Sequence, residues 1–170
     1  MTTPPPAEPR SGLPAPVTEA DLDAAMDLAS ANILVVDDHE QNLELIEAYL
    51  EDVGCKVRTA KDGLEALARI DETPPDLILL DVMMPRMSGF QLCSKLKTDP
   101  ATRDIPIVMV TALSEVGDVE RAVECGADDF LTKPVFKLEL VTRAKSLLRV
   151  RLLRKQLEAT LQEMRRIKGD

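Results

Sequence analysis

The chain has few aromatic residues: they make up 2% of its 170 residues, and tryptophan is absent. Its core must therefore be built from aliphatic side chains. Proteins that read nucleic acid by stacking bases on aromatic rings need several such rings on one surface. The composition therefore argues against nucleic acid as a partner.

Cysteine and histidine are also scarce. The three cysteines, Cys55, Cys93 and Cys125, are widely spaced without a C-x-x-C pair, and His39 is the only histidine. This usage argues against a disulfide framework or a zinc site and fits a reducing compartment. No apolar run approaches the roughly 20 residues that span a bilayer, and the N-terminus lacks a basic-then-apolar signal sequence. We therefore expect a cytoplasmic protein that makes no contact with membrane.

The net charge of −9 is unevenly distributed along the chain. Acidic residues outnumber basic ones by 11 in residues 33–136, whereas basic residues outnumber acidic ones by 6 in residues 137–170. An acidic body repels nucleic acid and anionic lipid. The basic C-terminal segment is better interpreted as a solvated helix face than as a binding surface.

Composition divides the chain into four segments. Residues 1–17 are rich in proline and poor in large apolar side chains, so we expect a disordered tail. Thr18 is a suitable N-cap for a short amphipathic helix within residues 18–31. A globular domain then occupies residues 32–145, and residues 146–170 form a helical extension.

From Ile33 onward, strand and helix signals alternate five times. The expected strands are 33–37, 57–60, 77–81, 106–111 and 129–132. The expected helices are 40–53, 63–71, 90–97, 115–125 and a last one from 137. Such short β-α units predict an α/β fold, a doubly wound five-stranded parallel sheet with helices on both faces.

The last helix is longer than its domain needs. Residues 137–168 contain no proline or glycine, so this helix can extend for about 48 Å. A seven-residue apolar repeat, interrupted by Arg154, comprises Leu140, Leu147, Val150, Leu157, Leu161 and Met164. The repeat favours a dimeric coiled coil, and a linker helix that lies partly free is the alternative.

A polar side chain of chemical interest lies at the end of several apolar strands. In chain order these residues are Asp37, Asp38, Asp81, Thr111 and Lys133. The carboxyl ends of parallel strands meet at one edge of a sheet, where α/β proteins bind ligands. Three neighbouring carboxylates repel one another unless a cation lies between them. Because Mg²⁺ prefers oxygen ligands and leaves positions for phosphate oxygens, the set predicts a magnesium and phosphoryl site.

Four segments together resemble the receiver domain of two-component response regulators: ILVVDDHEQN, PDLILLDVMMPRMSGF, IPIVMVTA and GADDFLTKP. The resemblance extends over residues 32–145. It implies the flavodoxin-like strand order 2-1-3-4-5. It also implies that the protein accepts a phosphoryl group in a phosphorelay and does not act as a conventional enzyme. The implied partner is a histidine kinase or a histidine phosphotransfer protein.

The same resemblance implies a role for each site residue. Asp81 is the phospho-acceptor, and the Thr111 hydroxyl and the Lys133 ammonium bind phosphoryl oxygens. The implied Mg²⁺ ligands are Asp38, Asp81, the backbone carbonyl of Met83 and, through water, Asp37.

Three residues resemble the switch elements of the family. Movement of Thr111 toward the phosphoryl group would let Phe130 turn inward, and Pro134 matches a cis-proline that aims Lys133 into the site. The implied output face comprises the fourth helix, the fifth strand and the fifth helix of the domain. We expect a homodimer through this face, through the C-terminal helix, or through both.

Other functions have weaker support. A flavin or nucleotide enzyme needs a phosphate-binding loop after the first strand, where residues 37–40 are anionic instead. An aspartate-nucleophile phosphohydrolase usually has a second acid two residues after the nucleophile, where this chain has Met83. A degenerate receiver used only for protein contact conflicts with the complete site. A receiver that regulates a longer protein, such as a cyclic-dinucleotide enzyme or a hybrid kinase, stays open.

Four neighbours of the site receive a structural interpretation. His39 follows the acidic pair, and we interpret it as a surface residue rather than a ligand. Met83, Met84 and Met87 are interpreted as loop packing that limits access to the site.

Overall fold

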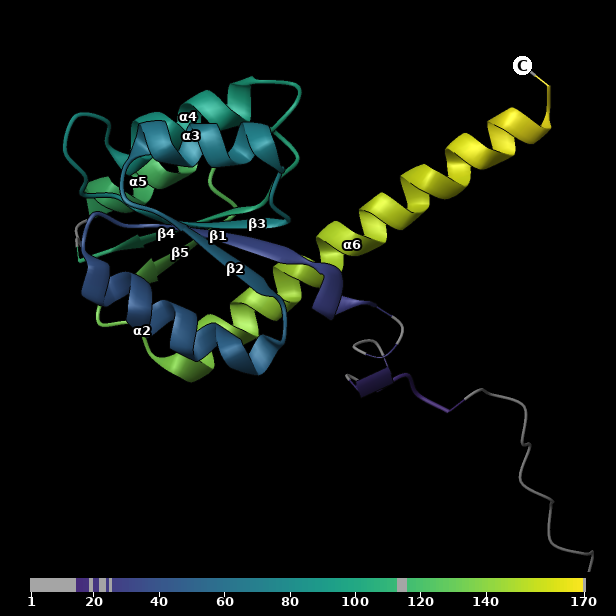
Figure 1. The fold of residues 1–170 in the computed structure, drawn as a ribbon, viewed down its shortest axis with the longest axis horizontal. Coiled ribbons are helices and arrows are strands. Elements are labelled where there is room, and N and C mark those ends of the chain that lie inside the picture. Colours follow the sequence, from purple (N-terminus) through teal and green to yellow (C-terminus); the bar gives the residue numbers. More distant parts are fainter. Residues whose placement is uncertain (1–14, 19, 22–23, 25, 113–115, 170) are drawn as a thin grey trace, which may run out of the picture.

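The computed structural model describes residues 15–18, 20–21, 24, 26–112 and 116–169, and it has three layers (Figure 1). A parallel sheet with strand order β2-β1-β3-β4-β5 forms the middle layer. The strands are β1 (Asn32–Val36), β2 (Lys56–Ala60), β3 (Leu77–Asp81), β4 (Ile107–Thr111) and β5 (Asp129–Thr132). This arrangement confirms the predicted doubly wound, flavodoxin-like sheet.

Helices cover both faces of the sheet, as predicted. They are α2 (Glu40–Leu50), α3 (Gly63–Glu72), α4 (Gly89–Thr98), α5 (Val116–Glu124) and α6 (Lys137–Ile167). In Figure 1, α3, α4 and α5 lie on one side of the sheet, and α2 and α6 lie on the other. Side chains of a strand alternate between the two faces. Accordingly, Leu34 and Val36 of β1 join the hydrophobic cluster beneath the first group, and Ile33 and Val35 join the second cluster.

The clearest difference from the predicted helix boundaries is at the end of α2. The helix expected over residues 40–53 ends at Leu50 and continues as a 3₁₀ turn, η2 (Glu51–Val53). Gly54 ends this turn with a φ of 75°, a left-handed conformation that glycine adopts without steric cost. The expected start of the helix over 115–125 lies outside the described residues.

The N-terminal segment packs on the domain. Of the disordered tail predicted for residues 1–17, residues 1–14 lie outside the described residues. The amide of Asp21 donates to the Thr18 hydroxyl at 3.2 Å, which is the capping contact expected of Thr18. Near the domain the expected helix gives way to a 3₁₀ turn, η1 (Leu28–Ser30). Met26 and Leu28 are buried, so this segment adds to the core on the α2 and α6 side.

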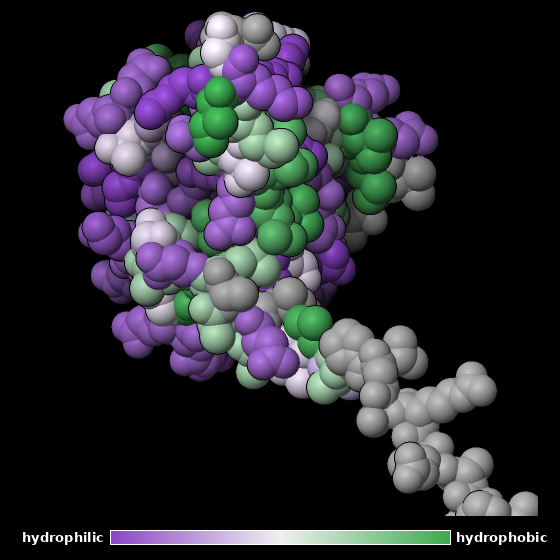
Figure 2. Space-filling model, turned by 90° about the vertical axis from the view of Figure 1, so that its right-hand side faces the viewer, coloured by the Kyte–Doolittle hydropathy of each residue, from purple (hydrophilic) through white to green (hydrophobic). Residues whose placement is uncertain are grey.

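Helix α6 has 31 residues, and its first half is packed on the domain whereas its second half is not. Leu140, Ala144 and Leu148 are buried against the sheet, whereas the second half projects away from the domain (Figure 1). Leu152 still packs partly on the core, but six other large apolar residues from position 150 onward are exposed: Val150, Leu153, Leu157, Leu161, Met164 and Ile167. Figure 2 shows the face toward which α6 projects, where hydrophobic residues form a band among hydrophilic ones.

Ion pairs fix the point at which α6 leaves the domain. Lys155 pairs with the buried carboxylate of Asp76, next to the amino end of β3. Asp76 also accepts a 2.9 Å hydrogen bond from the backbone amide of Asn32 at the start of β1. Nearby, Arg151 donates to the carbonyl of Asp104 at 3.2 Å. These contacts hold the extension against the amino edge of the sheet.

Replacing Asp76 by alanine should destabilise the domain, because the amide of Asn32 and the ammonium of Lys155 lose their common acceptor. A buried donor left without a partner costs roughly 1–3 kcal/mol. We expect Asp76→Ala to lower the free energy of unfolding by about 2 kcal/mol in urea titrations. Asp71→Ala, at an exposed acid on α3, is the control and should change it by less than about 0.5 kcal/mol. Equal effects of the two substitutions would contradict a structural role for Asp76.

Candidate metal and phosphoryl site

The polar residues singled out in the sequence converge at the carboxyl edge of the sheet. Asp37 and Asp38 follow β1, Asp81 ends β3, Thr111 ends β4, and Lys133 follows β5. Strands β1, β3 and β4 are adjacent and in parallel register, which brings their ends together. Asp37, Asp81 and Thr111 are buried, with exposed fractions of 2%, 3% and 0%.

Lys133 lies between two of the carboxylates. Its Nζ is 3.2 Å from Oδ2 of Asp37 and 3.4 Å from Oδ1 of Asp81. The resemblance implied that Lys133 binds phosphoryl oxygens, and in the structure it contacts Asp37 as well as Asp81. One ammonium thus compensates part of the charge of two buried acids.

Asp37 is held by the start of helix α2. Its Oδ1 accepts from the backbone amide of His39 at 2.8 Å, and its Oδ2 accepts from Nδ2 of Asn42 at 3.1 Å. Together with Lys133, these donors occupy both carboxylate oxygens. These contacts hold the Asp37 carboxyl group in one position.

The surroundings of Asp81 disfavour the ionised form of its carboxyl group. Burial and the negative charge of Asp37 raise the pKa of Asp81 above the usual aspartate range. Lys133 and the backbone amide of Met83 act in the opposite direction without cancelling the increase. A divalent cation would remove this penalty by pairing with the ionised form.

Asp38 supplies an oxygen that is suited to a cation. Its Oδ1 is buried, and it has no hydrogen-bond partner among the described residues. A buried acceptor without a donor indicates that an ion or a water completes the site. Asp37, Asp38, His39 and Asp81 each offer one ligand atom, and these atoms all lie within 4.8 Å of one another.

His39 belongs to this group although the sequence placed it at the surface. Its side chain is 68% exposed, yet Nδ1 lies 3.0 Å from Oδ1 of Asp38 and 3.4 Å from Oδ1 of Asp37. Both descriptions hold, because an exposed ring can still bring one nitrogen close to the two aspartates. Its position directly after the two aspartates was the signal that could have found it.

The remaining predicted residues line the same edge. The carbonyl of Thr111 accepts from the amide of Lys133 at 2.7 Å, which ties the ends of β4 and β5 together. Phe130 is half-buried and packs against the core cluster beneath α3, α4 and α5. The Lys133–Pro134 peptide bond is cis. The Met83 side chain is 60% exposed, whereas Met84 is buried.

Gly89 explains how the loop after β3 can lie so close to Asp81. A Cβ at this position would lie 2.2 Å from the carbonyl oxygen of Asp81. The amide of Gly89 donates to the carbonyl of Val82 at 2.9 Å, so the loop folds directly onto the strand end. Only glycine permits this approach.

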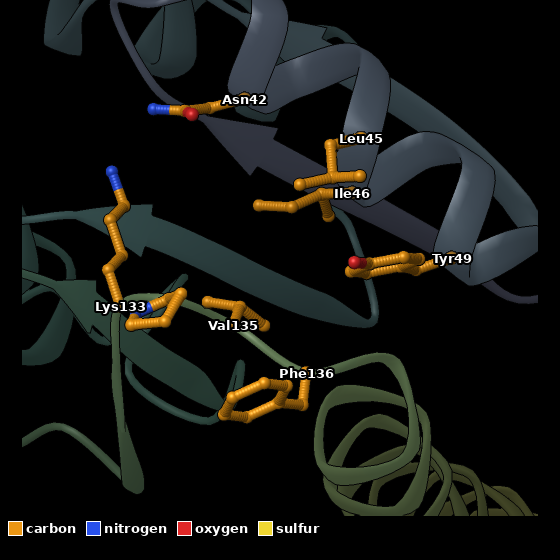
Figure 3. Close-up of a pocket in the computed structure, with 8 residues that line it drawn as sticks. Asn42, Leu45, Ile46, Tyr49, Lys133, Val135 and Phe136 are labelled. Carbon is orange, nitrogen blue, oxygen red and sulfur yellow. The ribbon is translucent and has the colours of Figure 1, made fainter.

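A groove adjoins the site between α2 and the loop that joins β5 to α6 (Figure 3). It has a volume of about 500 Å³. Lys133 and Asn42, both of which contact Asp37, point toward one another at one end of it. The rest of its lining is mainly apolar: Leu45, Ile46, Tyr49, Pro134, Val135 and Phe136.

The sheet order and the acidic edge define the class of protein. Residues 33–145 match the family described as the response regulator receiver domain, and the chain belongs to this family. It therefore contains the receiver domain of a two-component response regulator. None of the described helices is both long enough and apolar enough to span a bilayer.

Individual relatives extend the comparison. The chain is 53% identical to the response regulator PleD of Caulobacter vibrioides over 124 residues, which cover 73% of this chain and 27% of PleD. It is 41% identical to the DNA-binding dual master transcriptional regulator RpaA of Synechocystis over 117 residues, which cover 69% and 48%. The chain thus spans between about a quarter and a half of these curated relatives.

A solved structure shows the same fold. The receiver domain of a signal transduction histidine kinase from Syntrophus aciditrophicus is 42% identical and superposes with a TM-score of 0.66, covering 70% of this chain and 90% of that one. The similarity therefore extends to nearly the whole of that domain.

The raised pKa of Asp81 predicts how pH changes stability. A folded-state pKa above the unfolded value of about 3.9 means that the folded protein binds the proton more tightly, so stability falls as pH rises through this range. In metal-free buffer we therefore expect Asp81→Asn to raise the free energy of unfolding at pH 7, with no gain below about pH 4. Urea titrations between pH 4 and pH 7 measure it, and Asp71→Asn should show no such trend. A loss of stability in Asp81→Asn at pH 7 would contradict the argument.

Proposed function

We propose that this domain accepts a phosphoryl group on Asp81 from a histidine kinase or a histidine phosphotransfer protein. The observation that carries the proposal is the position of Asp81. It is a buried carboxylate at a strand end, in contact with Lys133 and next to two further aspartates. Phosphoryl transfer needs positioning and charge neutralisation more than covalent help, and this arrangement supplies both.

The balance of the transfer is simple. A carboxylate oxygen of Asp81 forms a bond to phosphorus while the bond between phosphorus and the donor imidazole nitrogen breaks. The product is an acyl phosphate on Asp81 and a free histidine on the donor. The polar groups around Asp81 must therefore hold charge on three non-bridging oxygens.

We assign the cation ligands by what each residue already contacts. Both oxygens of Asp37 accept hydrogen bonds, which supports an indirect role through water. The unpartnered Oδ1 of Asp38 supports a direct role, with Asp81 and the Met83 carbonyl as the other protein ligands. Mg²⁺, when bound, would neutralise the carboxylates and leave positions for phosphoryl oxygens.

Lys133 and Thr111 would hold the transferred group. Lys133 already contacts Asp81, and its ammonium can bind an oxygen of the phosphoryl group without leaving the site. Thr111 is fully buried at the neighbouring strand end. Phe130 lies one strand further along, and we propose that its side chain turns inward when Thr111 moves. Pro134, which follows Lys133, is the third residue that we assign to the switch.

Phosphorylation would be read on the face of α5, β5 and α6, the fourth helix, fifth strand and fifth helix of the domain. Because α6 continues well beyond the sheet, repacking of its first half would move the extension. We infer that the domain works in the cytoplasm as the regulatory front of a longer protein. The partial coverage of PleD and RpaA supports a longer protein. The receiver of a signal transduction histidine kinase supports the hybrid-kinase alternative.

Labelling with a small phosphodonor tests the central proposal. Acetyl phosphate with Mg²⁺ should modify one site, and intact-mass and peptide analysis should place it on Asp81. Asp81→Asn should abolish labelling, Lys133→Met should slow it at least tenfold, and Asp71→Asn should label as the wild type does. Labelling without a divalent cation, or on another residue, would contradict the proposal.

The exposed apolar stripe of α6 supports a homodimer as the output state. Leu157 and Leu161 are 59% and 44% exposed, and in a parallel coiled coil they would pack against their counterparts. Beryllium fluoride should therefore increase self-association measured by sedimentation velocity, and Leu157→Glu should weaken it. Gln156→Glu, at the neighbouring polar position, is the control. Equal self-association with and without beryllium fluoride would count against phosphorylation-dependent pairing.

A further inference from the structure

Helix α6 packs on its own domain along one side. The contacts recur every three or four residues, through the buried Leu140, Ala144 and Leu148 and then through Arg151 and Lys155. Each residue of an α-helix is rotated by about 100° from the one before it. These five side chains therefore leave the helix within roughly 80° of one another, and they define the side of α6 that faces the domain.

The opposite side of α6 carries a row of exposed apolar residues. Val150, Leu153, Leu157, Met164 and Ile167 are between 50% and 76% exposed. They follow one another at intervals of three, four, seven and three residues, which are the intervals between a and d positions of a heptad. By the same rotation per residue, they point roughly 120–180° away from the side that faces the domain. The row therefore stays accessible while α6 is packed on its own domain.

Thr160 occupies the one heptad position of this row that lacks a large apolar residue. It follows Leu157 by three residues and precedes Met164 by four, so it is at a d position. Its hydroxyl donates to the carbonyl of Gln156 at 2.9 Å, one turn earlier on the same helix. Because the hydroxyl already has this partner, Thr160 can enter an apolar contact without leaving a donor unsatisfied. We call the complete row the seam: Val150, Leu153, Leu157, Thr160, Met164 and Ile167.

The seam differs from the heptad repeat expected from the sequence. That repeat includes Leu147 and continues through Arg154. In the structure, Leu147 packs against the core of its own domain, and Nη1 of Arg154 lies 3.8 Å from Oδ1 of Asp104. Both side chains are therefore engaged by the domain. The seam uses Leu153 and Thr160 instead, so the register shifts by one residue at these positions.

Charges beside the seam fit a second copy of the chain in parallel orientation. In a parallel pair of helices, a g residue faces an e residue of the other helix in the next heptad. Glu163 is at a g position of the seam and would face Lys168 of the second copy, which is an attractive contact. In an antiparallel pair with the same seam, Glu163 would face the uncharged Gln156 instead. The charge pattern therefore favours the parallel pair.

At the domain end of the seam, the flanking charges are alike. By the same rule, Arg149 of one copy would face Arg154 of the other, and two arginines repel each other. Asp104, in the loop before β4, holds Oδ1 3.8 Å from Nη1 of Arg154 and offsets part of this repulsion. The receiver domain therefore assists the pairing through the negative charge that it places beside the helix.

We propose that two copies of the chain pair in parallel through this seam, with each receiver domain held on the outer side of its own helix. Because the seam and the domain contacts are on opposite sides of α6, no contact with the domain has to break when the two helices meet. The ion pair of Lys155 with Asp76 then keeps each domain beside the coil. The inference rests on the proposed function for the homodimer, and it adds which residues meet and in which orientation.

Cysteine cross-linking of the full chain tests the register. The background carries Cys55→Ser, because Cys55 is the cysteine that is not fully buried. In a parallel pair, seam positions bring two copies of one residue to the Cα separation of roughly 4.4–6.8 Å that a disulfide needs. With beryllium fluoride, Mg²⁺ and copper phenanthroline as oxidant, Thr160→Cys should therefore form covalent dimer about fivefold faster than Leu161→Cys. Met164→Cys, a position common to both repeats, should match Thr160→Cys, and Gln162→Cys, on the domain side of the helix, measures random collision.

Two outcomes of the cross-linking experiment would overturn the inference. If Leu161→Cys reacts as fast as Thr160→Cys or faster, the seam is wrong and the repeat expected from the sequence is restored. If neither Thr160→Cys nor Met164→Cys exceeds Gln162→Cys, the α6 helices do not pair.

Charge reversal tests the orientation. Glu163→Lys places like charges across a parallel seam and should weaken self-association about fivefold in sedimentation velocity. Glu163 also lies 3.9 Å from Arg166 of the same helix, so the decisive variant is the double one that adds Lys168→Glu. This second change should restore self-association to within about twofold of the wild type. Glu158→Lys, at an exposed acid away from the seam, is the matched control and should change it by less than about twofold. A double variant that associates no more tightly than Glu163→Lys would contradict the parallel orientation.

These outcomes are separable from those of the proposed function. Mg²⁺-dependent labelling of Asp81 together with slow cross-linking of Thr160→Cys overturns the seam and leaves the phospho-acceptor role standing. Conversely, fast cross-linking of Thr160→Cys in a chain whose Asp81 is not labelled supports the seam and counts against the proposed function.

Discussion

The structure depends on the repulsion between carboxylates at one edge of a parallel sheet. Asp37 and Asp81 are both buried, and Asp38 lies beside them. Like charges at this separation cannot all be stable without compensation. Lys133 supplies one positive charge, and the start of α2 supplies backbone and side-chain donors to Asp37. Lys133 alone does not balance the negative charge of three carboxylates. A cation can pair with the remaining charge and can also bind the oxygens of a phosphoryl group.

Much of the fold was predictable because its signals are local. Apolar runs such as Leu77–Leu80 are buried on both faces of the sheet, so hydrophobicity alone identified the strands. The site followed from the same signals, since strand ends fix where Asp81 and Thr111 lie. The strand order could not be predicted from these local signals, because β-α units of similar length fit more than one order. It was implied instead by the resemblance to receiver domains.

Other features were not predictable because they depend on contacts between distant residues. The pairing of Asp76 with Lys155 joins positions 79 residues apart, and no local pattern relates them. The burial of Leu28 depends on a surface that α2 and α6 create only after folding. The approach of the His39 ring to Asp38 depends on a side-chain orientation, which a sequence does not contain.

The site and the exit of α6 lie at opposite edges of the sheet. Asp81 is at the carboxyl end of β3, while Asp76, which holds Lys155, precedes its amino end. Helix α6 runs from one edge to the other, because it begins after the carboxyl end of β5, packs Leu140 and Leu148 on the core and brings Lys155 to Asp76. Lys155, which pairs with Asp76, lies about 18 Å before the end of α6 at Ile167, so a rotation of about 10° at this contact moves the far end by about 3 Å. A small change beside the phosphoryl site would therefore reach the exposed stripe as a displacement of its far end, provided that the Asp76 contact acts as the pivot.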